Sequence, residues 1–123
     1  MPDTGRDAVL RCLPLTPAVF DILLSLADED RHGYGIAKEI EGRTAGRVRL
    51  GPGTLYGTLT RMLEAGLVQE CPGPASDEPA AERRRYYRIT PFGRDVARAE
   101  ARRLAELVRT AKAKALLKPG RLG

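Results

Sequence analysis

The stretch that decides the fold reads GPGTLYGTLTRMLEAG and covers residues 51–66. Its apolar residues form one stripe of an α-helix, because they stand at relative positions 0, 4, 7 and 8; they are Leu55, Leu59, Met62 and Leu63. The opposite face is small, hydroxylated and cationic, with Thr54, Tyr56, Gly57, Thr60 and Arg61. A helix with such a face can enter the DNA major groove with its N-terminus first. We therefore interpret the stretch as a recognition helix.

Two further helices are predicted before it. Thr16 and Pro17 are a typical N-cap and first helical residue, and a broad apolar face follows to Ala27. Residues 31–35 are predicted to be a tight turn into a second helix, which ends between residues 42 and 46. Residues 47–50 alternate between charged and apolar side chains and are predicted to be a short strand.

A β-hairpin and a long helix are predicted after it. Residues 67–71 and 83–90 have the pattern of strands, and residues 72–82 between them are rich in Pro, Gly, Ala and acids, as in a loop. Tyr87 and Ile89 share the face that we expect to point into the core, while Tyr86 and Arg88 face outward with Arg84. Thr90 and Pro91 begin a helix that runs to about residue 115.

This order predicts a mainly α fold with a small β-hairpin, namely a winged helix-turn-helix with an added C-terminal helix. The expected organisation is an N-terminal extension over 1–14, the winged helix-turn-helix over 15–90, a dimerisation helix over 91–115 and a flexible tail over 116–123.

The last helix has a heptad seam with spacings of 4, 3, 4, 3 and 4 residues, formed by Ala97, Ala101, Leu104, Val108, Ala111 and Ala115. The seam predicts a homodimer, with Val19 and Leu23 of the first helix contributing from its broad apolar face. The alternative is that this helix packs only on its own domain.

Composition limits the classes of protein. The chain has 123 residues, a net charge of +5, two cysteines and no apolar run near the roughly 18 residues that span a bilayer. The positive charge is concentrated in residues 83–112, which sum to +7, whereas residues 15–65 sum to −1. We expect a cytoplasmic protein without membrane contact. No paired carboxylates, Cys/His cluster or phosphate loop points to an enzyme, a metal or a cofactor, and the lone His32 is not expected to bind metal.

The chain resembles the PadR family of transcriptional regulators, of the short type with a single C-terminal helix. The matching pieces keep the family order; they are Leu15-Thr16-Pro17, His32-Gly33-Tyr34-Gly35-Ile36, Gly53-Thr54-Leu55-Tyr56 with Leu59 and Leu63, Glu64-Ala65-Gly66-Leu67, and Arg85-Tyr86-Tyr87-Arg88-Ile89-Thr90 with Gly93. The resemblance implies a dimeric winged-helix protein that binds double-stranded DNA, usually a repressor at a palindromic operator. Many members release DNA when a small aromatic or apolar compound binds near the dimer interface. This chain differs in having no tryptophan and in its long acidic hairpin loop.

The candidate DNA-binding residues come from three segments: Tyr34 and Lys38 of the second helix, Gly53, Thr54, Tyr56, Gly57, Thr60 and Arg61 of the recognition helix, and Arg83, Arg84, Arg85 and Tyr86 of the wing. Alternatives remain for each group: a solvated helix face, a half-buried Tyr56, a Tyr34 that caps the second helix, and a wing charge run that only meets water.

An effector, if the protein has one, is expected between residues 8–19 and the partner's last helix, with Val19, Leu104, Leu107 and Val108 as candidates. The alternative function is a winged-helix module that binds protein instead of DNA, which the near-neutral recognition half favours.

Overall fold

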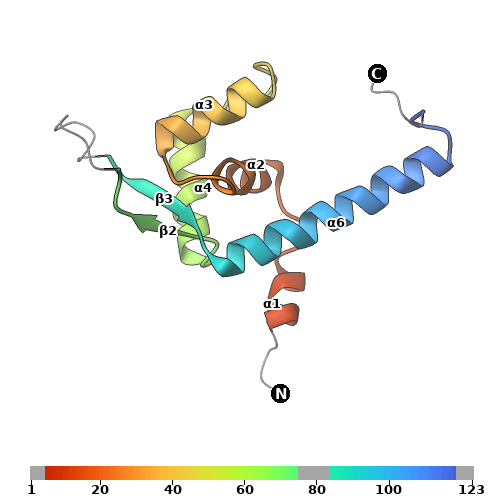
Figure 1. Ribbon diagram of the computed structural model, residues 1–123, viewed down its shortest axis with the longest axis horizontal. Coiled ribbons are helices and arrows are strands. Elements are labelled where there is room, and N and C mark those ends of the chain that lie inside the picture. Colours follow the sequence, from red (N-terminus) through yellow and green to blue (C-terminus); the bar gives the residue numbers. More distant parts are fainter. Residues whose placement is uncertain (1–4, 75–83, 119–123) are drawn as a thin grey trace.

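The structure of the protein, a computed structural model, describes residues 5–74 and 84–118. Its elements in chain order are α1 (Gly5–Arg11), α2 (Pro17–Leu26), β1 (Arg31–His32), α3 (Gly33–Arg43), α4 (Pro52–Glu64), β2 (Val68–Cys71), β3 (Tyr86–Ile89) and α6 (Pro91–Ala113). In Figure 1, α2, α3 and α4 gather beside the sheet, while α6 leaves this group and extends away from it. The predicted winged helix-turn-helix with a long C-terminal helix is confirmed.

Local capping starts the helices where the sequence predicts. The Thr16 hydroxyl accepts a hydrogen bond from the Val19 N–H at 3.4 Å, and the Thr90 hydroxyl accepts one from the Gly93 N–H at 2.9 Å. Each cap is followed by a proline at the first helical position, where a missing N–H costs nothing. At the other end of α4, Gly66 adopts a φ of +76°, which lets the chain turn sharply into β2.

The sheet has three antiparallel strands in the order β1-β3-β2. The hairpin pairs Val68 with Ile89 and Cys71 with Tyr86, so Tyr87 and Ile89 point inward with 3% and 6% of their surface exposed, as predicted. Two expectations are wrong. The first strand is Arg31–His32, where the sequence predicts a turn, and residues 47–50, where the sequence predicts a strand, form none. A strand of two residues has too little pattern to be recognised before its partner is known.

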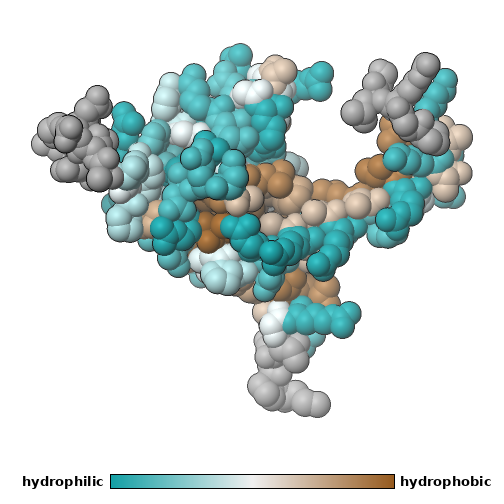
Figure 2. Space-filling view, in the orientation of Figure 1, coloured by the Kyte–Doolittle hydropathy of each residue, from teal (hydrophilic) through white to brown (hydrophobic). Residues whose placement is uncertain are grey.

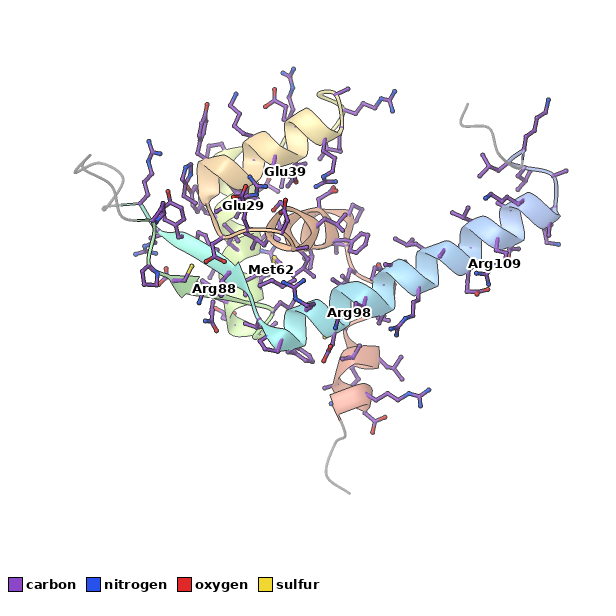
Figure 3. The ribbon with its side chains drawn as sticks, viewed as in Figure 1. Glu29, Glu39, Met62, Arg88, Arg98 and Arg109 are labelled. Atoms are coloured by element: carbon purple, nitrogen blue, oxygen red, sulfur yellow. The ribbon has the colours of Figure 1, made fainter. Side chains whose placement is uncertain are left out.

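The core lies between the three helices, the sheet and the start of α6. Met62 of α4 sits at its centre (Figure 3) and is 1% exposed, and Leu59, Ile36 and Ile22 are equally enclosed. The first turn of α6 meets the α4–β2 turn so closely that a Cβ at Gly93 would lie 2.0 Å from the Leu67 carbonyl oxygen. This contact fixes where α6 leaves the winged domain.

Two expectations about the last helix and the dimer surface need correction, and the N-terminal extension is found to contain a helix. This helix, α1, packs on α6. The last helix ends at Ala113, and Ala115 has a φ of +62°, so Ala115 lies outside the helix and its seam. Leu23 is completely buried in the core of its own domain, so it has no surface to offer a partner.

The acids that follow α2, for which the sequence suggests no structural reason, form ion pairs with Arg31 next to them and with Arg88 of the sheet. Asp30 pairs with Arg88 of β3 at 2.8 Å, and Arg31 pairs with Glu29 at 3.0 Å. The Arg88 hydrogen bond, the largest effect, holds the pKa of Asp30 below its usual value. These acids therefore tie the end of α2 to the sheet.

Candidate nucleic-acid interface

The outer face of α4 is free in the structure. Gly53, Thr54, Thr60 and Arg61 are exposed, and Tyr56 is 48% exposed, whereas Leu55, Leu59 and Met62 are buried. The division of α4 into an apolar inner face and a small, hydroxylated outer face is thus confirmed. Gly57, which is half-buried, leaves open space above the helix, since a Cβ there would meet only the Arg61 guanidinium at 3.8 Å.

Two hydroxyls of α4 are used within the helix. The Thr58 hydroxyl donates to the Thr54 carbonyl at 2.7 Å and accepts from Arg61 Nη2 at 3.3 Å. Thr60 donates to the Tyr56 carbonyl at 2.9 Å. Thr58 is buried, so it orients the Arg61 side chain from below while the rest of the guanidinium stays at the surface.

The start of α3 lies next to this face. Tyr34 is 64% exposed, and the Lys38 ammonium lies 5.4 Å from the centre of its ring, a cation–π distance. A hollow of about 280 Å³ separates α3 from α4 and is lined by Tyr34, Lys38 and Tyr56 among others. The tyrosines of the two helices therefore share one surface.

The cap of α3 is His32, whose Nδ1 accepts a hydrogen bond from the Gly35 N–H at 2.9 Å. The alternative that Tyr34 caps this helix is therefore wrong, and its hydroxyl is free to meet a ligand. Sequence reasoning missed His32, which it treated as a lone turn residue. A side chain that can accept a hydrogen bond, placed three residues before Gly35, was the available signal.

The wing side of the surface is formed by β3 and the residue pair before it. Arg84 and Arg85 are exposed, and Arg85 lies 3.6 Å from Glu70 on β2. Tyr86 is half-buried and packs edge-on against the His32 ring, with 5.3 Å between the ring centres. Arg83, the fourth wing candidate, lies outside the described residues, as do the acids of the hairpin loop.

Charge pairing divides the arginines and lysines into two groups. Arg88, Arg43 and Arg103 pair with carboxylates within the fold. Among the residues that the structure describes, Lys38, Arg61 and Arg84 have no carboxylate within salt-bridge distance. These three cations lie on α3, α4 and the wing, the elements that carry the predicted contact residues. We call the exposed surface of Tyr34, Lys38, Tyr56, Arg61 and Arg84 the recognition face.

A second surface follows α6. Residues 105–110 are all exposed, and Leu107 and Val108 are 54% and 44% exposed. Figure 2 shows hydrophobic residues gathered along this helix beyond the winged domain. Of the predicted seam, Ala97 packs against the core, Ala101 is exposed, and Leu104 and Ala111 are half-buried.

A groove of about 840 Å³ runs between α1 and α6, with Val9, Leu10 and Ala99 on its apolar part and Arg98 and Arg102 at its edge. None of the predicted effector residues, Val19, Leu104, Leu107 and Val108, lines this groove. Val19 is half-buried against the core, and the other three lie on another side of α6.

Residues 5–74 and 84–118 contain neither a cluster of metal-binding side chains nor a helix that could span a bilayer. No group of three or more His, Cys, Asp or Glu side chains lies close enough together there to hold a metal ion. No helix in these segments is both long and apolar enough to cross a bilayer.

Fold and surface together define a winged-helix protein with a long accessory helix. Residues 22–99 match the model of the Transcriptional regulator PadR-like family. This match covers more than half of the chain, which therefore belongs to the PadR-like family of transcriptional regulators.

The chain is also similar to individual curated proteins, one of which is named a transcriptional regulator. The chain is 36% identical over 90 residues to the transcriptional regulator Rv3488 of Mycobacterium tuberculosis, covering 72% of this chain and 76% of that protein. It is 34% identical over 73 residues to an uncharacterized protein X of Lysinibacillus sphaericus, covering 59% of this chain. The chain spans 64% of that relative's length and 22% of a 37.1 kDa protein of Streptomyces fradiae. Among solved structures, a transcriptional regulator from Clostridium thermocellum superposes with a TM-score of 0.65 at 30% identity, covering 79% of this chain and 87% of the other.

Proposed function

We propose that this protein is a sequence-specific DNA-binding regulator, a cytoplasmic repressor that acts as a homodimer on a palindromic operator. The observation that carries the proposal is the recognition face, where three cations without carboxylate partners surround two exposed tyrosines on α3, α4 and the wing. Unpaired Lys and Arg side chains favour phosphate groups, and a winged helix presents such side chains to a DNA duplex.

The parts of the recognition face have different tasks in this proposal. The exposed start of α4, with Gly53, Thr54 and Gly57, fits the groove, because small side chains let the helix approach the base edges. Arg61 contacts a base or a phosphate. Arg84 and Arg85 grip the backbone from the wing, and Arg85 leaves the exposed Glu70 to do so.

Binding and its salt dependence test the proposal. DNA bound by the wild-type protein is first selected from a genomic library, and a palindrome is expected. Arg61→Ala is expected to weaken binding to the selected site by about 1–3 kcal/mol. Arg84→Ala is expected to lower the slope of log K against log salt by about 0.9.

Arg109→Ala is the matched control, because Arg109 lies on the outer half of α6, where it pairs with Glu106 (Figure 3). Unchanged binding in both Arg61→Ala and Arg84→Ala would contradict the assignment of these residues to the DNA-binding site. No DNA selected at low salt, together with a specific protein partner, would favour the protein-binding module.

The homodimer is proposed to form through α6, around Ala101, Leu104, Val108 and Ala111. Exposed Leu107 and Val108 on a helix that extends beyond its domain favour a partner, because a stripe of this kind is unfavourable in water. Val108→Glu is expected to give monomers in light-scattering chromatography, whereas Ala105→Glu, which is also exposed but off the seam, is expected to leave the dimer intact. A dimeric Val108→Glu variant would contradict this interface.

Release of DNA by a small aromatic or apolar effector is proposed to act at the same interface, with Val19 and the partner copy's α6 as its walls. A screen of such compounds for loss of operator binding tests this step. A compound that releases DNA from wild type and from Leu107→Ala equally well would bind elsewhere.

A further inference from the structure

The imidazole of His32 contacts residues of α3 and of the wing, in addition to its place in the turn before α3. It caps α3 through the Gly35 N–H, lies parallel to the Tyr34 ring with 6.2 Å between ring centres, and meets Tyr86 edge-on. Its Nε2 lies 3.3 Å from Nη1 of Arg84. One ring therefore joins the start of α3 to the wing.

The hydrogen bonds of this ring conflict in the absence of a ligand. A neutral imidazole has one nitrogen that accepts and one that donates. Because Nδ1 accepts from the Gly35 N–H, Nε2 carries the hydrogen, and this hydrogen faces the N–H groups of Arg84. Two donors thus point at the same space without an acceptor between them.

The surroundings keep the ring neutral. The pKa of His32 lies below its ordinary 6.5, mainly because the ring is partly buried and also because the Arg84 guanidinium lies close to it. The charged groups near the ring on β1 and in the segment between α2 and β1 are already paired, since Arg31 binds Glu29 and Asp30 binds Arg88. From α4 the neighbour is Tyr56, and from the start of β3 it is Arg85 beside Arg84. At neutral pH the Nε2–H donor is therefore present without a carboxylate to accept from it.

The two residues that carry these donors, His32 and Arg84, line a pocket. It has a volume of about 320 Å³ and is lined by His32, Gly33, Tyr34, Tyr56, Arg84 and Arg85. These side chains offer an imidazole N–H, two phenolic hydroxyls and two guanidinium groups, and none of them is a carboxylate. Such a lining fits an oxyanion with several acceptor atoms.

We propose that this pocket binds one phosphate group of the DNA backbone, and that His32 Nε2–H and Arg84 Nη1–H donate to it together. The inference rests on the proposed DNA-binding function and adds a contact residue to it. The phosphate supplies the acceptor that the two donors lack, while Nδ1 keeps its bond to Gly35. Binding at this point thereby orders the wing against α3, so His32 both contacts the backbone and positions Arg84.

Variants at position 32 distinguish the role of Nδ1 in capping α3 from the role of Nε2 in binding phosphate. Asparagine at position 32 can still cap α3, but its short side chain does not reach the pocket. His32→Asn is therefore expected to retain the wild-type melting temperature and to bind the selected DNA about tenfold more weakly at pH near 7.5, as for the loss of one hydrogen bond to a charged group. Its salt slope is expected to match wild type, because His32 is a neutral donor that releases no counterion and the Arg84 guanidinium can still reach the phosphate. His32→Ala, which loses the cap as well, is expected to lose both stability and affinity.

A direct measurement is available because His32 is the only histidine of the chain. Nitrogen-15 NMR of labelled protein is expected to show the Nε2–H tautomer, with the Nε2 proton shifting downfield when DNA is added. An Nδ1–H tautomer, or wild-type affinity in His32→Asn, would overturn the proposal. Failure of the DNA-binding function itself gives a different result, because wild-type protein would then show no salt-dependent DNA binding.

Discussion

Glu100 is a buried carboxylate whose removal has a calculable cost. Only 2% of its surface is exposed, and its Oε2 accepts from the Leu15 N–H at 2.9 Å, across 85 residues of sequence. Arg103 holds the same carboxylate at 2.5 and 3.1 Å. Glu100→Ala leaves the Leu15 N–H, which is partly buried, without this acceptor, at a cost of about 1–3 kcal/mol, and the cavity raises the total toward about 3 kcal/mol. Arg103 is 37% exposed and can turn to water, so its lost bonds add little.

Urea or thermal unfolding at one protein concentration measures this cost. Glu100→Ala is expected to lower the melting temperature by roughly 10 °C. Glu100→Gln is the matched control, because its amide oxygen can still accept from Leu15, and it is expected to lose only about 1 kcal/mol. Equal stability of Glu100→Ala and wild type, or equal losses in the two variants, would refute the assignment of the Leu15 bond as the main contribution.

The pH dependence gives a second check on Glu100. The Arg103 hydrogen bond, followed by the Leu15 N–H, holds the pKa of this carboxyl below its ordinary 4.5. A lowered folded pKa means that the unfolded chain binds more protons near that pH, so the stabilisation is complete above 4.5 and is lost as the pH falls below it. The stability difference between wild type and Glu100→Gln is therefore expected to shrink in acid.

Three other outcomes are expected. Gly93→Ala should destabilise the fold by about 3 kcal/mol or more, since its Cβ would clash with the Leu67 carbonyl. Gly42→Ala, in the open part of α3, should instead stabilise the fold by about 0.5–1 kcal/mol. Chemical denaturation measures both changes. Gly57→Ala should leave stability unchanged or higher but weaken DNA binding in a mobility-shift assay, because the added methyl stands between the helix and the groove; equal affinity would show that DNA does not approach there. The pKa of His32 is lowered on folding, so wild type should lose stability as the pH falls below its ordinary 6.5, and a calorimetric scan of His32→Asn should lack this loss.

The charge distribution explains how affinity and specificity are divided in the proposed function. Residues 15–65, which include the recognition helix, sum to −1, whereas residues 83–112 sum to +7. Part of that positive charge is used inside the fold, since Arg88 and Arg103 pair with Asp30 and Glu100. The electrostatic attraction to DNA therefore depends on a few free cations, which makes each of them sensitive to substitution.

Elements set by neighbouring residues were predictable from the sequence. The Thr16-Pro17 and Thr90-Pro91 starts were predictable because a cap needs only the next three residues. The two faces of α4 and the inward side of β3 followed from helix and strand periods. The resemblance to PadR regulators rests on these same local pieces and agrees with the matched family model.

Contacts between distant segments were decided only by the tertiary structure. Arg31–His32 becomes a strand because β3 lies beside it, and His32 contacts the wing because Arg84, 52 residues away, comes within 3.3 Å. Leu23 looked like a dimer contact because its apolar helix face is broad, yet its own domain buries it completely. The physical reason is common to these cases. Caps and periods depend on residues within about four positions, whereas burial and long-range pairing depend on which segments the folded chain brings together.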